Sequence, residues 1–167
     1  MIIVVMGVCG CGKTTIGRAL AQTLGWPFHD ADDFHPDANV TKMAAGNALD
    51  DTDRWPWLDR IVTAMQGVQS AGGHAVLACS ALKQVYRDRL QRAGDVRFVY
   101  LRGDAQIIGA RLSARSHKYM PASLLPSQFA TLEEPRDAVV VDIRQSPAEQ
   151  VQFVRTHYAL VAAPSAR

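Results

Sequence analysis

The sequence predicts a three-layer α/β domain, in which a parallel sheet of about five strands lies between two layers of helices. Short apolar segments alternate with longer helical ones along the chain, as in βαβ units with right-handed crossovers. Residues 96–101 and 138–143 are largely apolar at successive positions, which indicates strands covered on both faces. A chain of 167 residues is long enough for one domain with a sizeable core, so we expect residues 1–167 to form a single domain.

Five short segments have the β-branched or apolar composition of strands: Ile2–Met6, Pro27–His29, Ala75–Cys79, Arg97–Leu101 and Ala138–Ile143. Five longer segments have helical periodicity: Lys13–Leu24, Trp57–Ala71, Ala81–Arg92, Ala105–Ala114 and Ala148–Tyr158. Ligands of such a sheet bind at the carboxyl ends of its strands, so the loops there are the candidate functional segments.

Two long connections interrupt the alternation of strands and helices. Residues 30–56 are acidic and rich in turn formers, whereas residues 117–135 contain three prolines. Long connections within a compact domain are usually functional. We therefore expect the first to form a second-substrate region and the second to belong to a lid, approximately residues 115–135.

The segment between the first strand and the first helix fits the phosphate-loop pattern G-x-x-x-x-G-K-[ST]. Its glycines let the backbone turn so that successive N–H groups face one anion, and the helix adds its positive dipole end. Lys13 would reach the β- and γ-phosphates, and the Thr14 hydroxyl would be a ligand of Mg²⁺. A glycine-rich turn with a chance Lys-Thr is the alternative. The predicted nucleotide-binding residues are Gly7, Val8, Cys9, Gly10, Cys11, Gly12, Lys13, Thr14 and Thr15.

The charge balance limits the possible partners. A net charge of +2 argues against a general nucleic-acid-coating protein. Eight of the sixteen acids lie between Asp30 and Asp59, and nine of the eighteen Lys and Arg residues lie between Lys83 and Lys118. This division suits phosphate contacts on one side of a site and hydroxyl or cation contacts on the other.

No apolar run approaches the roughly 20 residues of a membrane span, so no membrane partner is expected. The cysteines are Cys9, Cys11 and Cys79, an odd number that fits a reducing cytoplasm. Cys9 and Cys11 are interpreted as small space-fillers in the phosphate loop, with a redox or metal-binding pair as the alternative.

Carboxylates cluster after the second strand, in the segment from Asp30 to Pro36. A carboxylate at this position can accept a hydrogen bond from a substrate hydroxyl or hold a water bound to Mg²⁺. Asp32 is the candidate for orienting and deprotonating the attacking hydroxyl, and Asp30 is a second substrate-binding candidate. The alternative is a solvated acidic turn that caps a helix. His35 could ligate a metal, but local packing is the simpler interpretation.

Basic side chains supply the remaining candidates. Arg54 could bind a substrate carboxylate through two hydrogen bonds, with a surface ion pair to Asp50 or Asp51 as the alternative. Ser80, Lys83 and Arg87 could face one ligand, because Lys83 and Arg87 are four residues apart on a predicted helix. A solvated helix face is the alternative for that pair.

Arg111 and Arg115 are also four residues apart, at the end of the helix that leads into the lid. They could close over the transferring phosphoryl group and spread its charge, or they could lie on a solvated face. The third predicted strand ends in Cys79-Ser80 without an acid. Magnesium would therefore depend on Thr14, phosphate oxygens and water, with help from Asp32.

Several segments together resemble those of the small phosphate-loop gluconokinases, which are akin in fold to shikimate kinase and adenylate kinase. The resemblance covers residues 2–143 and is carried by Asp30-x-Asp32 with His35-Pro36, Lys42-Met43-Ala44-x-Gly46, Leu49-x-Asp51-x-Asp53-Arg54-x-Pro56-Trp57-Leu58, Cys79-Ser80-Ala81-Leu82-Lys83-x-x-Tyr86-Arg87-Asp88 and Ser127-Gln128-x-x-x-Leu132-Glu133-x-Pro135.

The resemblance implies a P-loop kinase fold and the transfer of a phosphoryl group from ATP to D-gluconate with Mg²⁺. The product, 6-phosphogluconate, would feed carbohydrate acid catabolism and the pentose phosphate pathway. The resemblance also implies a cytoplasmic homodimer, places the ATP phosphates at residues 7–14 and the lid arginines, and places gluconate near Asp32, Arg54, Lys83 and Arg87. One departure is visible: the lid lacks the family's glycine, and His117 stands one position early.

Two other functions remain open. A kinase for another hydroxy acid such as shikimate would use the same phosphate loop, although the Asp53-Arg54-x-Pro56-Trp57-Leu58 segment argues against shikimate. A nucleotide-dependent switch would have no small acceptor and would sense the γ-phosphate through mobile loops. The crowded carboxylates favour an acceptor pocket.

Overall fold

The computed structural model describes residues 1–113 and 125–161. Its five strands are β1 (Ile2–Met6), β2 (Phe28–Asp30), β3 (Ala75–Ala78), β4 (Val96–Arg102) and β5 (Ala138–Asp142). All neighbouring strands pair in parallel, in the order β2-β3-β1-β4-β5. The prediction of a five-stranded parallel sheet is therefore confirmed.

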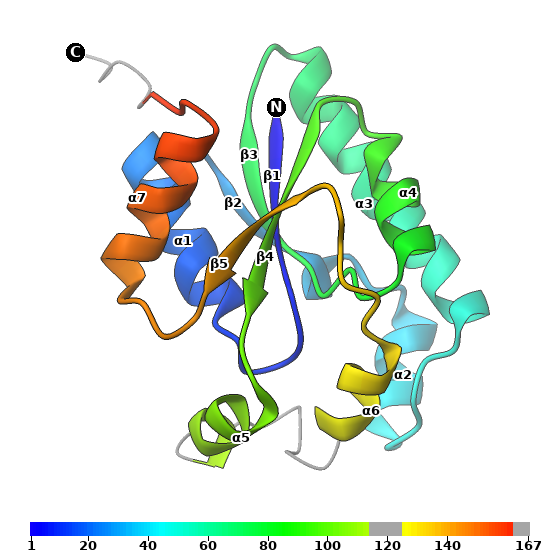
Figure 1. Ribbon diagram of the computed structural model, residues 1–167. Coiled ribbons are helices and arrows are strands. Elements are labelled where there is room, and N and C mark those ends of the chain that lie inside the picture. The colour runs from blue at the N-terminus through cyan, green and yellow to red at the C-terminus, as the bar shows by residue number, and fades with distance from the viewer. Residues whose placement is uncertain (114–124, 162–167) are drawn as a thin grey trace.

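The α-helices are α1 (Lys13–Leu24), α2 (Asp37–Ala44), α3 (Asp51–Ser70), α4 (Gln84–Gln91), α5 (Ala105–Ser113), α6 (Leu125–Thr131) and α7 (Pro147–His157), and a 3₁₀ turn spans Ala31–Phe34. Helices α1 and α7 cover one face of the sheet, and α3 and α4 cover the other (Figure 1). The shorter helices α2, α5 and α6 lie near the carboxyl ends of the strands, at the bottom of that view. Across the two described ranges, no helix combines the length and apolar character needed to cross a membrane.

Strand β1 shows why the central strands are apolar at every position. Ile3 and Val5 belong to a core cluster with side chains of α1 and α7, whereas Ile2, Val4 and Met6 pack with α3 and α4. Successive side chains of a strand point to opposite faces, so a strand covered on both faces needs an apolar residue at each position.

The predicted boundaries fail where local chemistry differs from simple periodicity. Helix α3 begins at Asp51 instead of Trp57, because Asp50 and Asp53 form a capping box and Pro56 is accommodated inside the helix. Helix α4 begins at Gln84 instead of Ala81, because Ala81 has a positive φ of 44° that a helix cannot include. Helices α2 and α6 were not predicted, since each is short and lies in a connection rich in turn formers.

Leu58 provides a test of this packing. Its side chain on α3 has no solvent exposure and belongs to the cluster against β1 and β3. We expect Leu58→Ala to lower the free energy of unfolding by about 2–5 kcal/mol, through lost apolar burial and the cavity that remains. Urea denaturation measures the change.

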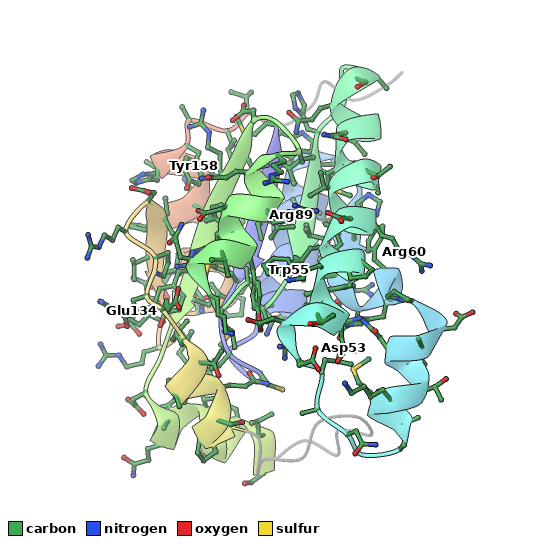
Figure 2. The ribbon with its side chains drawn as sticks, turned by 90° about the vertical axis from the view of Figure 1, so that its right-hand side faces the viewer. Asp53, Trp55, Arg60, Arg89, Glu134 and Tyr158 are labelled. Atoms are coloured by element: carbon green, nitrogen blue, oxygen red, sulfur yellow. The ribbon has the colours of Figure 1, made fainter. Side chains whose placement is uncertain are left out.

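Arg89→Met is the control. Arg89 lies on the α4 surface (Figure 2) and forms an ion pair with the half-exposed Asp59 of α3. Solvent screens such a pair, so only a small change in the free energy of unfolding is expected. Equal effects would contradict the assignment of the core.

Candidate active site

The phosphate loop, residues 7–14, connects β1 to α1. Gly7, Gly10 and Gly12 have φ values of 141°, 80° and 107°, which favour glycine. A Cβ atom at Gly10 would also lie 2.6 Å from Cγ of Leu112, and one at Gly7 would lie 2.8 Å from Sγ of Cys11. At Gly7 and Gly10, both the backbone conformation and the close packing therefore disfavour larger residues, whereas at Gly12 only the backbone conformation does.

Lys13 and Thr14 stand at the start of α1, where the helix dipole favours an anion. The Lys13 ammonium donates a hydrogen bond to the Val8 carbonyl oxygen at 3.0 Å, so the side chain folds back along the loop. The Thr14 hydroxyl donates to Oδ2 of Asp30 at 3.3 Å. Because Asp30 ends β2, this contact joins the phosphate loop to the acidic turn.

The thiols of Cys11 and Cys79 are not nucleophiles at neutral pH. Burial raises the pKa of Cys11, and it raises the pKa of Cys79 to about 12. All three cysteines are free, and Cys11 packs directly against Gly7. For Cys11, this agrees with its interpretation as a space-filling residue; Cys79 is buried as well.

Oxygen atoms suited to Mg²⁺ come from Thr14 and Asp30. A hydroxyl and a carboxylate are hard ligands of the kind that Mg²⁺ uses together with water and substrate phosphates. Strand β3 ends without an acid, as the sequence indicates, and within residues 1–113 and 125–161 no group of three His, Cys, Asp or Glu side chains could hold a metal ion alone. The donor set thus fits a cation shared with a bound nucleotide. The sequence suggested help from Asp32, whereas Asp30 is the acid that contacts Thr14.

Asp32 lies in the 3₁₀ turn after β2, and its backbone N–H donates to Oδ1 of Asp30. Desolvation by the surrounding protein raises the pKa of the Asp32 carboxyl, and the Asp30 charge adds to the rise while Lys13 opposes it. The side chain itself remains 87% exposed, so solvent screens these effects and the carboxylate is free to meet a ligand. A raised pKa brings the group closer to the range useful for a general base.

His35 is a packing residue beside this turn. Its ring stacks on Trp57 with 4.7 Å between centroids, and Trp57 in turn donates to the Ala31 carbonyl. Burial lowers the pKa of His35, and the nearby Arg54 charge lowers it further, so the ring is neutral. These contacts hold the acidic turn against α3.

A cationic cluster, formed by Arg54, Lys83, Asp51 and Tyr86, lies between the start of α3 and the start of α4. The Lys83 ammonium donates to both carboxylate oxygens of Asp51, at 2.9 and 2.7 Å. The Tyr86 hydroxyl also donates to Asp51, and the Arg54 guanidinium lies 3.5 Å from it. Two cations thus surround one carboxylate, and the cluster can accept one further negative charge.

Arg54 keeps hydrogen-bond donors of its guanidinium available for a further negative charge. Its NH1 group donates to the Tyr86 hydroxyl at 3.3 Å, and the guanidinium carbon lies 5.7 Å from the Tyr86 ring centroid. The ion pair with Asp51 that was the alternative to carboxylate binding is therefore present, but it is long and occupies one edge of the guanidinium.

Arg87 does not join this cluster, although its spacing of four residues from Lys83 predicted a shared helix face. Lys83 precedes α4 in an extended conformation, so the two residues do not share a helix face. Arg87 is 2% exposed and donates to the carbonyl oxygens of Ala81 and Leu82. These hydrogen bonds stabilise the turn before α4, and a contact of Arg87 with the substrate stays a prediction. Ser80 lies beside the phosphate loop, where its carbonyl oxygen accepts the Gly7 N–H at 3.3 Å.

Of the two predicted lid arginines, Arg111 lies within the described residues. Arg111 on α5 donates from NH2 to the Ile143 carbonyl oxygen at 2.7 Å, which places its charge beside the end of β5. Arg115, His117 and the other residues from 114 to 124 lie outside the described residues. Residues 125–131 of the predicted lid form helix α6.

Three residues of this region were missed as site candidates: Asp51, Tyr86 and Gln128. The sequence indicates Asp51 as a possible ion-pair partner of Arg54, and it indicates both Asp51 and Tyr86 as parts of the family pattern, without a role in binding. Gln128 accepts a hydrogen bond from the Cys9 N–H at 2.6 Å, across 119 residues of sequence. No local signal reveals such a contact, because only the tertiary fold brings α6 to the phosphate loop.

Comparisons with known proteins identify the family of this chain. A family model described as shikimate kinase matches residues 9–152. A gluconokinase of Gluconobacter oxydans is 49% identical over 138 residues, covering 81% of this chain and 76% of that protein. An unliganded sugar kinase from Janibacter superposes with a TM-score of 0.90 at 42% identity over 98% of both chains. A gluconokinase structure from Sinorhizobium meliloti has a TM-score of 0.81 at 41% identity, over 94% of this chain and 90% of that one. The chain therefore belongs to the gluconokinases, within the wider P-loop kinase family that the shikimate kinase model describes.

Proposed function

We propose that this protein transfers the γ-phosphoryl group of ATP to the terminal hydroxyl of D-gluconate, producing 6-phosphogluconate and ADP. The observation that carries the proposal is the contact between Thr14 and Asp30, which joins a phosphate-binding loop to an acidic turn. An acceptor hydroxyl beside Asp32 would then be close to a phosphate held by the loop. Gluconokinases at 40–49% identity support gluconate as the acceptor.

The roles of the residues follow from their chemistry. The loop N–H groups and Lys13 would bind the phosphates and neutralise charge as the bond to the leaving oxygen breaks. Asp32 would accept the proton of the acceptor hydroxyl, while the oxygen of that hydroxyl forms the new bond to the γ-phosphorus. Mg²⁺, bound through Thr14 and Asp30, would supply further charge neutralisation. Positioning and electrostatics would account for most of the rate enhancement.

The cationic cluster would recognise the carboxylate of gluconate. Arg54 can offer a bidentate contact, and Lys83 supplies a second positive charge held in place by Asp51. A substrate with one carboxylate matches the single uncompensated positive charge of the cluster. Arg111, with Arg115 from the part of the lid that precedes α6, would contact the nucleotide phosphates.

We further propose that the protein acts as a cytoplasmic homodimer that requires Mg²⁺. The free thiols suit a reducing compartment, and the family resemblance supports a dimer. Light scattering tests the dimer, and a loss of activity in EDTA that Mg²⁺ restores tests the metal.

The decisive experiment measures ADP release from MgATP with a panel of acceptors. We expect strong stimulation by gluconate, weaker stimulation by related sugar acids, and none by shikimate. Stimulation by shikimate alone would establish the alternative kinase. Nucleotide binding without any stimulation by a sugar acid would favour a switch and contradict the proposal.

Arg54→Met tests carboxylate recognition. Loss of charge-assisted hydrogen bonds should raise the KM for gluconate by roughly 10- to 100-fold while the KM for ATP stays the same. Steady-state kinetics with each substrate varied in turn measures both constants. Arg60→Met is the matched control on the same helix, because Arg60 is exposed and points away from α4 (Figure 2). An unchanged KM for gluconate in Arg54→Met would remove Arg54 from the site.

A further inference from the structure

The segment from α6 to Glu133 touches both sides of the candidate active site, and neither contact has a role in the function described above. At one end, Gln128 accepts the Cys9 N–H of the phosphate loop. At the other, Glu133 accepts the Gln84 N–H at 2.6 Å and donates its own N–H to the Leu82 carbonyl at 2.9 Å. These two contacts, at Leu82 and at the first residue of α4, lie on either side of Lys83.

The contact with Cys9 uses a donor of the phosphate loop. Cys9 lies between Gly7 and Gly10, whose positive φ values make this part of the backbone intrinsically adaptable. The Gln128 side chain is half-buried and its oxygen is neutral, so it can hold the loop N–H without repelling a phosphate. A hydrogen bond at this position restricts the loop to one conformation.

The contact at Gln84 replaces a missing helix cap. Lys83 occupies the N-cap position of α4 but makes no capping hydrogen bond with its side chain. The Glu133 carboxylate provides that cap from another part of the chain and also suits the positive end of the helix dipole. The orientation of Lys83 and Tyr86 toward Asp51 therefore depends on Glu133.

Apolar packing makes the segment a rigid connection. Leu125 is buried in the core cluster of α1 and α7, and Phe129 packs against the same cluster. Leu132 packs against both this cluster and the cluster of α3 and α4. The segment thus crosses the carboxyl edge of the sheet from one layer to the other.

We propose that residues 125–133 form a strut that sets the distance between the nucleotide and the acceptor, with Gln128 and Glu133 as positioning residues. This rests on the proposed phosphoryl transfer. Gln128 fixes the position of the phosphate loop through the Cys9 N–H, and Glu133 fixes the position of the cationic cluster through the start of α4. Displacement of either end misaligns the acceptor hydroxyl and the phosphoryl group, to which transfer rates are very sensitive.

Gln128→Met tests the nucleotide end, because methionine has a similar length and lacks the strong acceptor. We expect kcat to fall by about 10- to 100-fold while the KM for gluconate is unchanged. Gln128→Glu keeps an acceptor oxygen and should retain more of the kcat, but its charge beside the phosphates should raise the KM for ATP. Gln152→Met, on the exposed face of α7, is the matched control. A lower melting temperature with unchanged kcat and KM would show a purely stabilising role and overturn the proposal.

Glu133→Ala tests the acceptor end. We expect the KM for gluconate to rise by up to about tenfold, with an unchanged KM for ATP, because the lost cap loosens Lys83. Glu133→Gln, which keeps an acceptor oxygen, should restore most of the affinity. Glu134→Ala is the neighbouring control; Glu134 follows the strut and accepts from the Tyr100 hydroxyl instead (Figure 2). A rise in the KM for both substrates, or for neither, would contradict the assignment of Glu133.

Amide NMR separates this proposal from the proposed function. In Gln128→Met, the Cys9 resonance and its loop neighbours should shift in the free protein, whatever the acceptor is. An unshifted Cys9 amide would overturn the strut even if gluconate is phosphorylated. Conversely, a shifted amide in a protein that ignores gluconate would reject only the proposed reaction.

Discussion

Replacing Lys13 with methionine should lower kcat/KM by about a thousandfold. In the structure, the Lys13 ammonium folds onto the Val8 carbonyl, within the loop that would surround the phosphates. No other lysine belongs to this loop or to the first turn of α1. Without it, the negative charge that develops on the transferring group and the leaving oxygen lacks its nearest protein cation. Steady-state kinetics and nucleotide titration measure the loss.

Arg18→Met controls for the removal of a positive charge from the same helix. Arg18 is exposed and its guanidinium lies over the Phe28 ring, 5.0 Å from the centroid. We expect nearly normal activity from this variant. Circular dichroism should show both variants folded, because the Lys13 contact with Val8 is a single hydrogen bond. A Lys13→Met enzyme with near-normal kcat/KM would mean that the loop does not bind the reacting phosphates.

Asp32→Asn should reduce kcat by about 10²- to 10⁴-fold, because asparagine can hold the acceptor hydroxyl but cannot take its proton. The wild-type pH profile should also lose activity on the acid side, as pH falls through the pKa of Asp32. Burial and the Asp30 charge raise that pKa, so the loss should begin at a higher pH than an ordinary aspartate would give. The residual activity of Asp32→Asn should lack this acid limb. An acid limb that persists in the variant would assign it to another group.

The same pKa shift has a consequence for stability. When folding raises a carboxyl pKa, the folded state binds the proton more tightly, so stability decreases as pH rises through the folded pKa. The ionised Asp32 is therefore slightly unfavourable at neutral pH, and Asp32→Asn should unfold at an equal or higher denaturant concentration than the wild type. Asp33→Asn, at the exposed neighbouring position, should change neither activity nor stability appreciably. A clearly destabilised Asp32→Asn would show that Asp32 has a structural role.

Much of the fold could be predicted because its signals are local and repeat along the chain. The apolar residues of β1 and the glycine spacing of residues 7–12 each indicate their own conformation without reference to distant residues. The acidic turn after β2 was expected near the phosphate loop because parallel strands end at one edge of the sheet. The Thr14–Asp30 contact has the proximity that this rule requires.

The errors arose where the partner of a polar group is not indicated by periodicity, even when that partner is near in the chain. Lys83 and Arg87 have helical spacing, yet α4 starts between them, and Arg87 is buried against the carbonyls of Ala81 and Leu82. The early start of α3 depends on a reciprocal cap between Asp50 and Asp53 that overrides the expected effect of Pro56. Periodicity reports which face of an element is apolar, but it does not report which polar group completes a hydrogen bond.

The sequence by itself determined the layered parallel sheet, the phosphate loop and the edge of the sheet where chemistry would occur. These follow from backbone sterics and from the local pattern of apolar residues, which act over a few residues. Only the tertiary structure decided that Asp51 holds Lys83 and that Gln128 reaches the Cys9 amide. A hydrogen bond requires its two atoms to lie within about 3 Å, and for residues far apart in the chain that distance is set by how the layers pack.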